Sequence, residues 1–446
     1  MQIVEKKIVT PAPWSADDLV AHVSDGVSFH LPNGAIPIRY AVTQSDEHHL
    51  HCEIGVVEGA PFYVRERLSN IFEFRARRLE TVDTFNAALI VPTGIGAEIG
   101  GHAGDASPIA MLLAESCDRI IVHPNVVNAS DINEMPANAL YVEGSVISRL
   151  LMGGIGLRPV RSNRVLVLVD EHIDSYFVDA AINTVSASRS TYGLHCSEVK
   201  RLSDPIRMFG NYSQSGRAVG RIENLEECLS YLNGCQKDFE AIALSSVIRV
   251  PQSYHMDYFL AGGEMVNPWG GVEAMLTHTI SSFINMPSAH APMLESKKVE
   301  NLTVGIVDPR MAAEAISVSF LQCVLKGLHK SPAIVSDVSL FGRADVLSAE
   351  DISCIVIPDG CIGLPTIAAL MQSIPVIAVR ENENLMRNDL THLPWGKGQF
   401  IQVDNYLEAA GVMNALRAGI SLESLRRPML ATTVTRLEKK SVQLKN

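Results

Sequence analysis

The chain has 446 residues, 47% hydrophobic and 19% charged, a composition that excludes an intrinsically disordered or fibrous protein. Its net charge of −12 means that duplex DNA or an anionic membrane would be repelled on average, whereas a local basic pocket for a small anion is compatible with it. The length allows two to four domains of roughly 100 to 200 residues each.

The cysteines and the N-terminus indicate a cellular compartment. The eight cysteines contain no C-x-x-C pair and no close set of Cys and His ligands, which favours reduced thiols over disulfides or a structural zinc site. The first residues, MQIVEKKIVTPAPW, contain no apolar signal core, and no apolar run reaches the ~18 residues that span a bilayer. We therefore expect a cytoplasmic protein without nucleic-acid or membrane partners.

Residues 1–80 are predicted to form a small α+β domain. Apolar and polar residues alternate in IPIRYAVTQ (36–44) and in HLHCEIGVV (49–57), which indicates a β-hairpin. The charged segment VRERLSNIFEFRARRLE (64–80) is predicted to be the helix that leads out of this domain.

From Phe85 onward, short apolar runs alternate with helical patterns. This alternation predicts an α/β body with parallel, doubly wound sheets covered by helices on both faces. The predicted strands are residues 87–92, 119–124, 164–170, 240–246, 302–308, 332–337, 352–358 and 374–380.

Two similar strings suggest an internal duplication. IVPTGIG (90–96) and VIPDGCIG (356–363) each follow a predicted strand and lead to a helix with a proline in its first turn. The stretches that begin at 164 and 302 match in outline as well. Duplicated α/β halves usually hold ligands between the carboxyl ends of their strands. The alternative is convergent patterning, because the shared strings are short. The predicted boundaries are 81–300 for the first unit, 301–430 for the second and 431–446 for a tail.

The loop TGIGAEIGGHAGDA (93–106) is dense in glycine and precedes a helix. Backbone N–H groups at such a helix start can hold a phosphate or a carboxylate. The spacing matches neither a Rossmann nor a Walker motif, so nucleotide binding is weakly supported. The alternative is a flexible connection. The predicted substrate-binding residues here are Gly94, Gly96, Gly100, Gly101 and Asp105.

His123, Asn125 and Asn128 follow the next predicted strand in HPNVVNASD. A strand end beside a glycine-rich loop can bring an imidazole and amides to a ligand. Caps of the following turn are an equally good explanation. We predict His123 as a catalytic residue and the two asparagines as substrate-binding residues.

The segment GGEMVNPWGGVEAMLTHTISSFINMPSAHAP (262–292) combines Glu273, His278 and His290 with a glycine-rich helix start. These side chains can form an acid/base site or, less readily, a metal site. Alternatively, Glu273 only complements the helix dipole and the histidines are satisfied core residues. We predict Glu273 and His290 as catalytic residues and no metal site.

Cys361 lies after a predicted buried strand and before a helix whose positive end can lower the pKa of a thiol. With Asp359 and Gly360, its turn resembles that of the aspartate/glutamate racemase superfamily, in which a Gly-Cys-Thr turn supplies a catalytic cysteine. Ile362 occupies the threonine position, and Ile95 lies opposite Cys361 in the first repeat, so a symmetric two-cysteine racemase is not supported.

A longer resemblance covers residues 85–427. VPTGIGAEIGGHAGDASP, HPNVVNASDIN, NALYVEG, NPWGGVEA, PSAHAP and IPVIAVRENENLMRNDL are similar to a domain-of-unknown-function family of bacteria, cyanobacteria and plastid-bearing eukaryotes. This resemblance implies a common fold unit and common site positions, and it implies no reaction.

RENENLMRND (380–389) follows the second repeat, where Arg380 and Asn382 can bind a carboxylate or amide of a substrate. A charged surface turn is the alternative.

Together these patterns predict a cofactor-independent enzyme that acts on a small polar or carboxylated metabolite and that can form a homo-oligomer. We expect an isomerase or lyase in which Cys361 is the nucleophile or base, His290 or His123 donates a proton and Glu273 orients or relays. The alternatives are a hydrolase, which can be metal-assisted, and a non-catalytic metabolite-binding protein.

Overall fold

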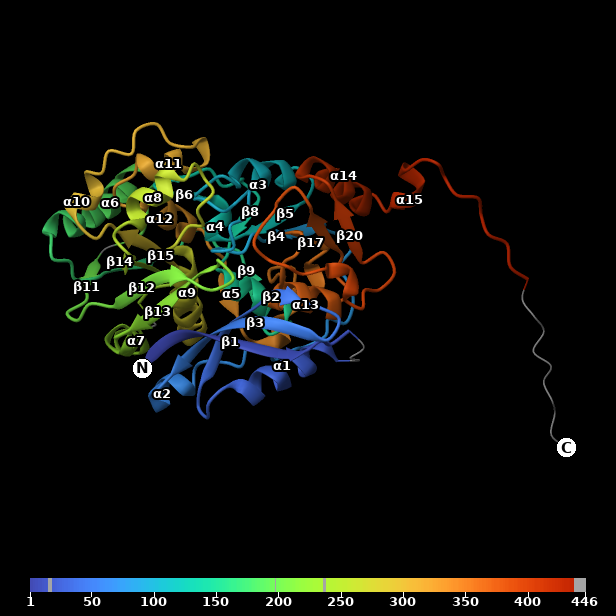
Figure 1. Cartoon of the computed structure of the whole chain (residues 1–446), viewed down its shortest axis with the longest axis horizontal. Coiled ribbons are helices and arrows are strands. Elements are labelled where there is room, and N and C mark those ends of the chain that lie inside the picture. The colour runs from blue at the N-terminus through green and yellow to red at the C-terminus, as the bar shows by residue number, and fades with distance from the viewer. Residues whose placement is uncertain (15–17, 197, 236–237, 437–446) are drawn as a thin grey trace.

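The computed structural model describes residues 1–14, 18–196, 198–235 and 238–436. It is a mixed α/β structure with a six-stranded parallel sheet and a larger, curled ten-stranded mixed sheet (Figure 1). No helix of the described residues is long and apolar enough to cross a membrane.

The parallel sheet contains both strands that precede the similar strings, and these two strands are neighbours. Every adjacent pair in this sheet is parallel. The strand order is β20 (Phe400–Val403), β19 (Val376–Val379), β17 (Cys354–Pro358), β4 (Asn86–Leu89), β5 (Arg119–Val122) and β8 (Ala139–Tyr141).

Helices cover both faces of the parallel sheet. Ala87 and Leu89 of β4 share a core with α3 (Ser107–Ala114) and α14 (Tyr406–Arg417). Ala88 and Ile90 point to the opposite core, which contains α5 (Gly144–Leu151) and α13 (Leu364–Met371). Alternate residues of one strand enter different cores because successive side chains point to opposite faces. The unbroken apolar runs of the sequence follow from this double burial.

The mixed sheet has a parallel part and an antiparallel part, joined where β14 pairs with both β10 and β12. The parallel part comprises β11 (Val199–Arg201), β10 (Val165–Val169), β14 (Ala241–Arg249) and β15 (Ser288–Met293). The antiparallel part comprises β12 (Arg207–Tyr212), β13 (Ala218–Glu223), β1 (Gln2–Pro11), β3 (His49–Glu58), β2 (Ile36–Ser45) and β18 (Ile362–Gly363), of which β18 directly follows the loop after β17.

The remaining elements surround these two sheets. α9 (Gly270–Ile284) contacts β2, β12, β13, β15 and α5, so it lies against strands from both parts of the mixed sheet. Two small sheets pair β16 (Ala333–Val335) with β9 (Gly156–Arg158) and β6 (Asn128–Ala129) with β7 (Ile132–Asn133). The other helices are α1 (Leu19–His30), α2 (Phe62–Arg65), α4 (Pro124–Val127), α6 (Ser175–Tyr192), α7 (Glu226–Gly234), α8 (Tyr254–Leu260), α10 (Lys297–Glu300), α11 (Ala312–Ala315), α12 (Gln322–His329) and α15 (Leu422–Leu425), with 3-10 turns η1 (Pro309–Met311), η2 (Val338–Leu340), η3 (Ala349–Asp351) and η4 (Leu390–His392).

Seven of the eight predicted strands are present, and residues 302–308 are the exception. This segment does not pair as a strand. Gly305 has a φ of +68°, which is outside the strand region, and the Ile306 side chain is fully exposed. The prediction for 332–337 was wrong in its partner, since β16 pairs antiparallel with β9 outside the large sheets. The repeat expected between 164 and 302 therefore has no second strand, and the internal duplication is not confirmed.

The N-terminal strands form one sheet with later strands. β1 pairs with β3 and with β13, and in Figure 1 the blue strands continue into the green ones. The helix predicted over 64–80 ends at Arg65, and the rest is irregular because its groups bond to other segments. Arg75 N–H donates to Met152 O (2.8 Å), and the Arg77 side chain donates to three carbonyls of later residues. Of the predicted tail, 431–436 are exposed and 437–446 lie outside the described residues.

Candidate functional site

A cavity of about 610 Å³ lies where the two sheets meet. Its walls come from β2, the loops after β4 and β17, α5, α9, β15 and the segment 301–320, which includes η1 and α11. Among the residues that line it are Arg39, Thr93, His123, Asn125, Asn128, Glu143, Arg149, Arg217, His255, Trp269, Glu273, Thr277, His278, His290, Glu314 and Cys361.

Both loops with a P-x-G string contribute to this cavity. Thr93, Ile95 and Ala103 come from the glycine-rich loop after β4, whereas Cys361 and Gly363 come from the turn after β17. The two loops meet there because β4 and β17 are parallel neighbours, so their carboxyl ends lie at the same edge of the sheet.

One face of α9 forms the polar wall of the cavity. Gly270, Glu273, Thr277 and His278 line it, at the i, i+3, i+7 and i+8 spacing that places side chains on one helix face. The helix begins where the Asn267 side-chain oxygen accepts from Trp269 N–H (3.0 Å) and Gly270 N–H (3.3 Å). Its second residue, Gly271, has no room for a side chain, since a Cβ would lie 2.1 Å from Ala218 O.

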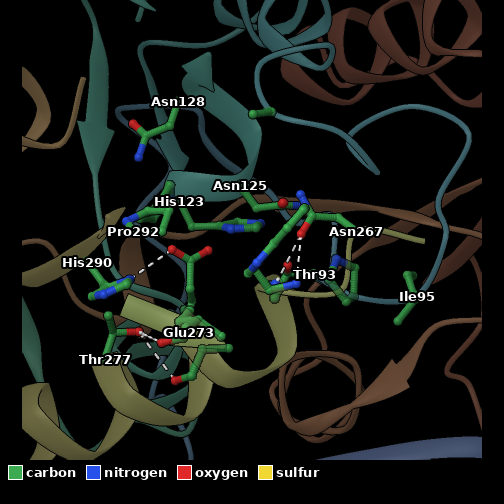
Figure 2. A pocket seen from close by; sticks show the side chains of 18 of the residues that line it. Thr93, Ile95, His123, Asn125, Asn128, Asn267, Glu273, Thr277, His290 and Pro292 are labelled. Carbon is green, nitrogen blue, oxygen red and sulfur yellow. Dashed lines mark hydrogen bonds and ion pairs between the residues drawn. The ribbon is translucent and has the colours of Figure 1, made fainter. Parts of the chain in front are cut away.

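Glu273 is the open end of a chain of three hydrogen-bonded side chains. His290 Nδ1 is 2.9 Å from Glu273 Oε1, and His290 Nε2 is 2.9 Å from Ser246 Oγ. Figure 2 shows the first of these contacts as a dashed line that ends on the Glu273 carboxylate. The Glu273 side chain is 30% exposed, the His290 side chain is 1% exposed, and Ser246 is fully buried. The carboxylate is therefore the member of the chain that is most open to a ligand.

His123 contributes a neutral imidazole to the cavity. Val91 N–H donates to its Nε2 (3.0 Å), which places the ring hydrogen on Nδ1. Burial, followed by the nearby His278, lowers the pKa of His123 to about 4. Nδ1 makes no hydrogen bond with the part of the chain that the structure describes, so it is available to donate to a ligand.

A second acidic residue and imidazole lie deeper along α9. His278 Nε2 is 3.1 Å from Glu143 Oε1, and Thr277 Oγ1 donates to the same oxygen (3.3 Å). Glu143 also caps α5 by accepting from Ser145 N–H (3.0 Å). Burial lowers the pKa of His278, and the Glu143 charge opposes this shift. Among the residues that the structure describes, no group of three or more His, Cys, Asp or Glu side chains could hold a metal ion.

Cys361 lines the cavity from an apolar wall. It is 5% exposed and has Ile357, Ile362 and Leu364 as buried neighbours in sequence. Burial, followed by the charge of Asp359, raises the pKa of the thiol. The sequence suggested the opposite direction, because the helix start at Leu364 was expected to lower it. Desolvation outweighs the helix terminus here.

Most of the other predicted binding residues do not line the cavity, and polar groups of several of them bind neighbouring chain segments. Asp105 accepts from Gly100 N–H (2.8 Å), and Asn382 donates to Ile99 O (2.9 Å) and Tyr406 OH (2.7 Å). Arg380 is exposed and paired with Asp404. Asn125 lines the cavity, yet its amide donates to Val91 O (3.0 Å) and Gly100 O (2.7 Å). The residues outside the lining are Gly94, Gly96, Gly100, Gly101, Asp105, Asp359, Gly360, Arg380 and Asn382.

Several lining residues were missed by the sequence analysis. Arg39 interrupts the alternating strand IPIRYAVTQ, and a cation among apolar residues is the signal that could have identified it. Glu143 precedes Gly-Ser at a helix start, which is a capping pattern and carries no functional signal. Trp269 and His255 pack together with ring centroids 5.7 Å apart, and their sequence separation gave no reason to combine them.

Comparisons with known proteins supply a family and no reaction. A protein from Synechococcus named as an uncharacterised lipoprotein is 32% identical over 349 residues, which is 77% of this chain and 93% of that protein. No solved structure matches the chain. The family described as "Protein of unknown function (DUF3326)" matches residues 86–426. This match covers most of the chain, including the loops and α9 around the cavity, and the chain belongs to that family.

Proposed function

We propose that the protein is a cofactor-independent enzyme of the isomerase or lyase type that removes a proton from a small polar or carboxylated metabolite. The observation that carries this proposal is the Ser246–His290–Glu273 chain, in which a carboxylate reaches the cavity and a buried imidazole holds it from behind. A positioned carboxylate with one oxygen fixed by a hydrogen bond is a suitable general base.

The proposed step uses two residues that line the cavity, Glu273 and His123. Glu273 takes a proton from a carbon next to a carbonyl or carboxyl group, and the electron pair of the broken C–H bond moves onto that group's oxygen. The Nδ1–H of neutral His123 donates a hydrogen bond to the oxygen as its charge develops. When the deprotonated carbon carries a hydroxyl group, transfer of the Glu273 proton to the former carbonyl carbon, and of the hydroxyl proton to the former carbonyl oxygen, completes an isomerisation. Loss of a leaving group from the next carbon completes a lyase reaction.

This assignment changes the roles that the sequence suggested. Glu273 becomes the base and His290 becomes a positioning residue, because both ring nitrogens of His290 are already bonded. Cys361 becomes a neutral wall residue, because burial raises the pKa of its thiol. A hydrolase that uses Ser246 as nucleophile is disfavoured, since Ser246 is fully buried behind His290 and does not line the cavity.

Solvent exchange tests the proposal without knowledge of the substrate. The protein in D₂O is mixed with 2-hydroxy, 2-amino and 2-oxo acids of about three to six carbons, and loss of the C–H signal is followed by proton NMR. We expect at least one compound to exchange with the wild type and not with Glu273→Gln. A panel in which no compound exchanges, or in which the variant exchanges at the wild-type rate, would contradict the proposal and favour a non-catalytic binding protein.

The cellular location of the protein is also a proposal. We propose a cytoplasmic location with a small molecule as the partner, and fractionation of cells that express the full chain tests it. The Synechococcus relative is named a lipoprotein, so recovery of this protein with membranes would transfer that property to it and overturn the cytoplasmic location.

A further inference from the structure

Two buried arginines line the cavity and differ in how their charges are compensated. Arg217 is fully buried and is ion-paired with Glu5 and with Glu53, whose Oε2 is 2.6 Å from Arg217 Nε. Arg39 is 8% exposed and makes no ion pair with any described residue. Its guanidinium donates to two carbonyl oxygens, Thr93 O and Gly271 O, each at 3.3 Å.

The absence of a direct ion pair between Arg39 and any described residue is unusual for a buried charged group. A buried cation without an anionic partner costs free energy, because two carbonyl dipoles replace only part of its hydration. Burial lowers the pKa of Arg39 to about 10, and the charge of Glu53 opposes this shift. The side chain therefore keeps its positive charge at neutral pH, and the carboxylate that acts on it, Glu53, is directly paired with Arg217 and not with Arg39.

The backbone around Arg39 provides the space that this side chain occupies. Gly55 lies directly opposite Arg39 in the β2–β3 pair, and a Cβ at position 55 would be 3.1 Å from Arg39 Cβ. The strand pairing thus leaves room for the arginine on the side of α9, where Gly271 accepts its hydrogen bond.

Arg39 is hydrogen-bonded to the first turn of α9, the helix that carries the proposed base. Gly271 lies in the first turn of α9, two residues before Glu273, and Thr93 belongs to the glycine-rich loop. The two hydrogen bonds therefore hold the guanidinium between the start of α9 and the glycine-rich loop, and Arg39 and Glu273 both line the cavity. The remaining N–H groups form part of a planar fork that matches the two oxygens of a carboxylate.

We propose that Arg39 is the carboxylate-binding residue of the cavity, and that the substrate is a small carboxylate whose neighbouring carbon faces Glu273. The inference rests on the proposed function for the role of that carbon. The binding site itself stands on the burial, hydrogen bonds and missing ion pair of Arg39. A bound carboxylate supplies the direct ion pair that this arginine does not make with the described residues.

The test measures binding and does not require turnover. Malonate, succinate and malate are titrated against the full chain by ligand-detected NMR, with malonamide and succinamide as uncharged controls. We expect at least one carboxylate to bind the wild type and its diamide not to bind. Arg39→Gln should weaken the affinity by about 30-fold, because a charged hydrogen-bonded pair is lost, and Arg39→Lys should give an intermediate loss.

Two further variants separate the possible failures. Arg119→Gln changes an exposed arginine at the start of β5 and should leave binding unchanged. Glu273→Gln should bind the carboxylate as well as the wild type or more tightly, because a like charge is removed, although it should not exchange protons. Binding that depends on Arg39 without any exchange would keep this site and overturn the proposed function.

Two results would overturn the inference. The first is that none of the three carboxylates binds the wild type at tens of millimolar. The second is equal binding by wild type and Arg39→Gln. If Arg39→Gln does not fold, Arg39→Lys decides the matter, and unchanged affinity in that folded variant would contradict recognition by the planar guanidinium.

Discussion

Two walls of the same cavity carry side chains of very different polarity. The wall of α9 and β15 carries Glu273, whose carboxylate is 30% exposed and is held by a buried histidine. The wall of β17 and β18 carries Cys361, whose thiol is surrounded by apolar residues and has a raised pKa. Cys361 precedes the start of α13, and Glu273 lies in the first turn of α9. Of the two side chains, only that of Glu273 is hydrogen-bonded to a buried polar side chain. At Cys361, burial therefore outweighs the nearby helix terminus in setting the pKa of the side chain.

The largest expected effect distinguishes the two walls directly. Glu273→Gln should lower the rate of solvent exchange by about 1000-fold, because the general base is lost while the shape is kept. Cys361→Ser should change the rate less than about threefold. Exchange rates of both variants on the same compound measure this difference. Inactive Cys361→Ser together with active Glu273→Gln would restore the cysteine mechanism.

The support behind Glu273 should give a smaller loss. His290→Leu should lower the exchange rate by about 10- to 100-fold with an unchanged KM, because the carboxylate loses the group that orients it. His290→Gln can still donate to Glu273 and should recover part of the rate. Thermal unfolding of both variants is the control. Equal rates for the two variants would reduce His290 to a packing residue.

The glycine-rich loop next to the polar wall should show a pH-dependent stability. Burial raises the pKa of Asp105 to about 7, and its Oδ2 is buried without a hydrogen-bond partner. The folded state therefore binds more protons than the unfolded state between about pH 4 and pH 7, so this group lowers the free energy of unfolding as the pH rises through that window.

Asp105→Asn removes that titration. The stability of the variant relative to the wild type should rise by about 2 kcal/mol between pH 5 and pH 8, a value discounted for partial exposure. Urea unfolding at both pH values measures it, and Asp25→Asn on an exposed helix face is the matched control. An identical pH dependence in Asp105→Asn and wild type would show that Asp105 ionises normally.

The smallest expected effect concerns the thiol itself. Iodoacetamide at neutral pH should label Cys361 as slowly as Cys354, because burial raises the pKa of both thiols. Cys235 is the half-buried cysteine and should be labelled first. Peptide mapping after short exposure gives the order. Preferential labelling of Cys361 would mean that its wall opens to solvent and would weaken the contrast between the walls.

Much of the fold could be predicted because its signals are local. Unbroken apolar runs predicted β4, β5, β17 and β19 of the parallel sheet and missed its two edge strands, β8 and β20. β4 and β17 lie side by side with their loops at one cavity. The same local pattern failed at 302–308, where an apolar run is irregular and contributes Leu302 and Val304 to the cavity instead of pairing. Periodicity specifies how residues alternate and not which surface they cover.

The candidate site was predictable in part. Glu273, His290 and His123 were identified as candidates, because polar residues at strand ends and helix starts are often placed at ligand sites. Their hydrogen bonds were not predictable, since Ser246 is 44 residues and Glu273 is 17 residues from His290. Nor could the sequence reveal that Asn382 and Arg380 bind neighbouring chain segments.

The sequence by itself determined the α/β class, the positions of many buried strands and the residue types available for acid/base chemistry, because these depend on short-range patterns of polarity. The tertiary structure decided which of those residues face the cavity and how burial shifts the pKa values of His123 and Cys361. Arg39 meets Gly271 across 232 residues of chain, and Cys361 has its pKa raised by burial among residues of two cores. Burial and long-range contacts set the charge of a side chain, and both arise only when distant segments pack together.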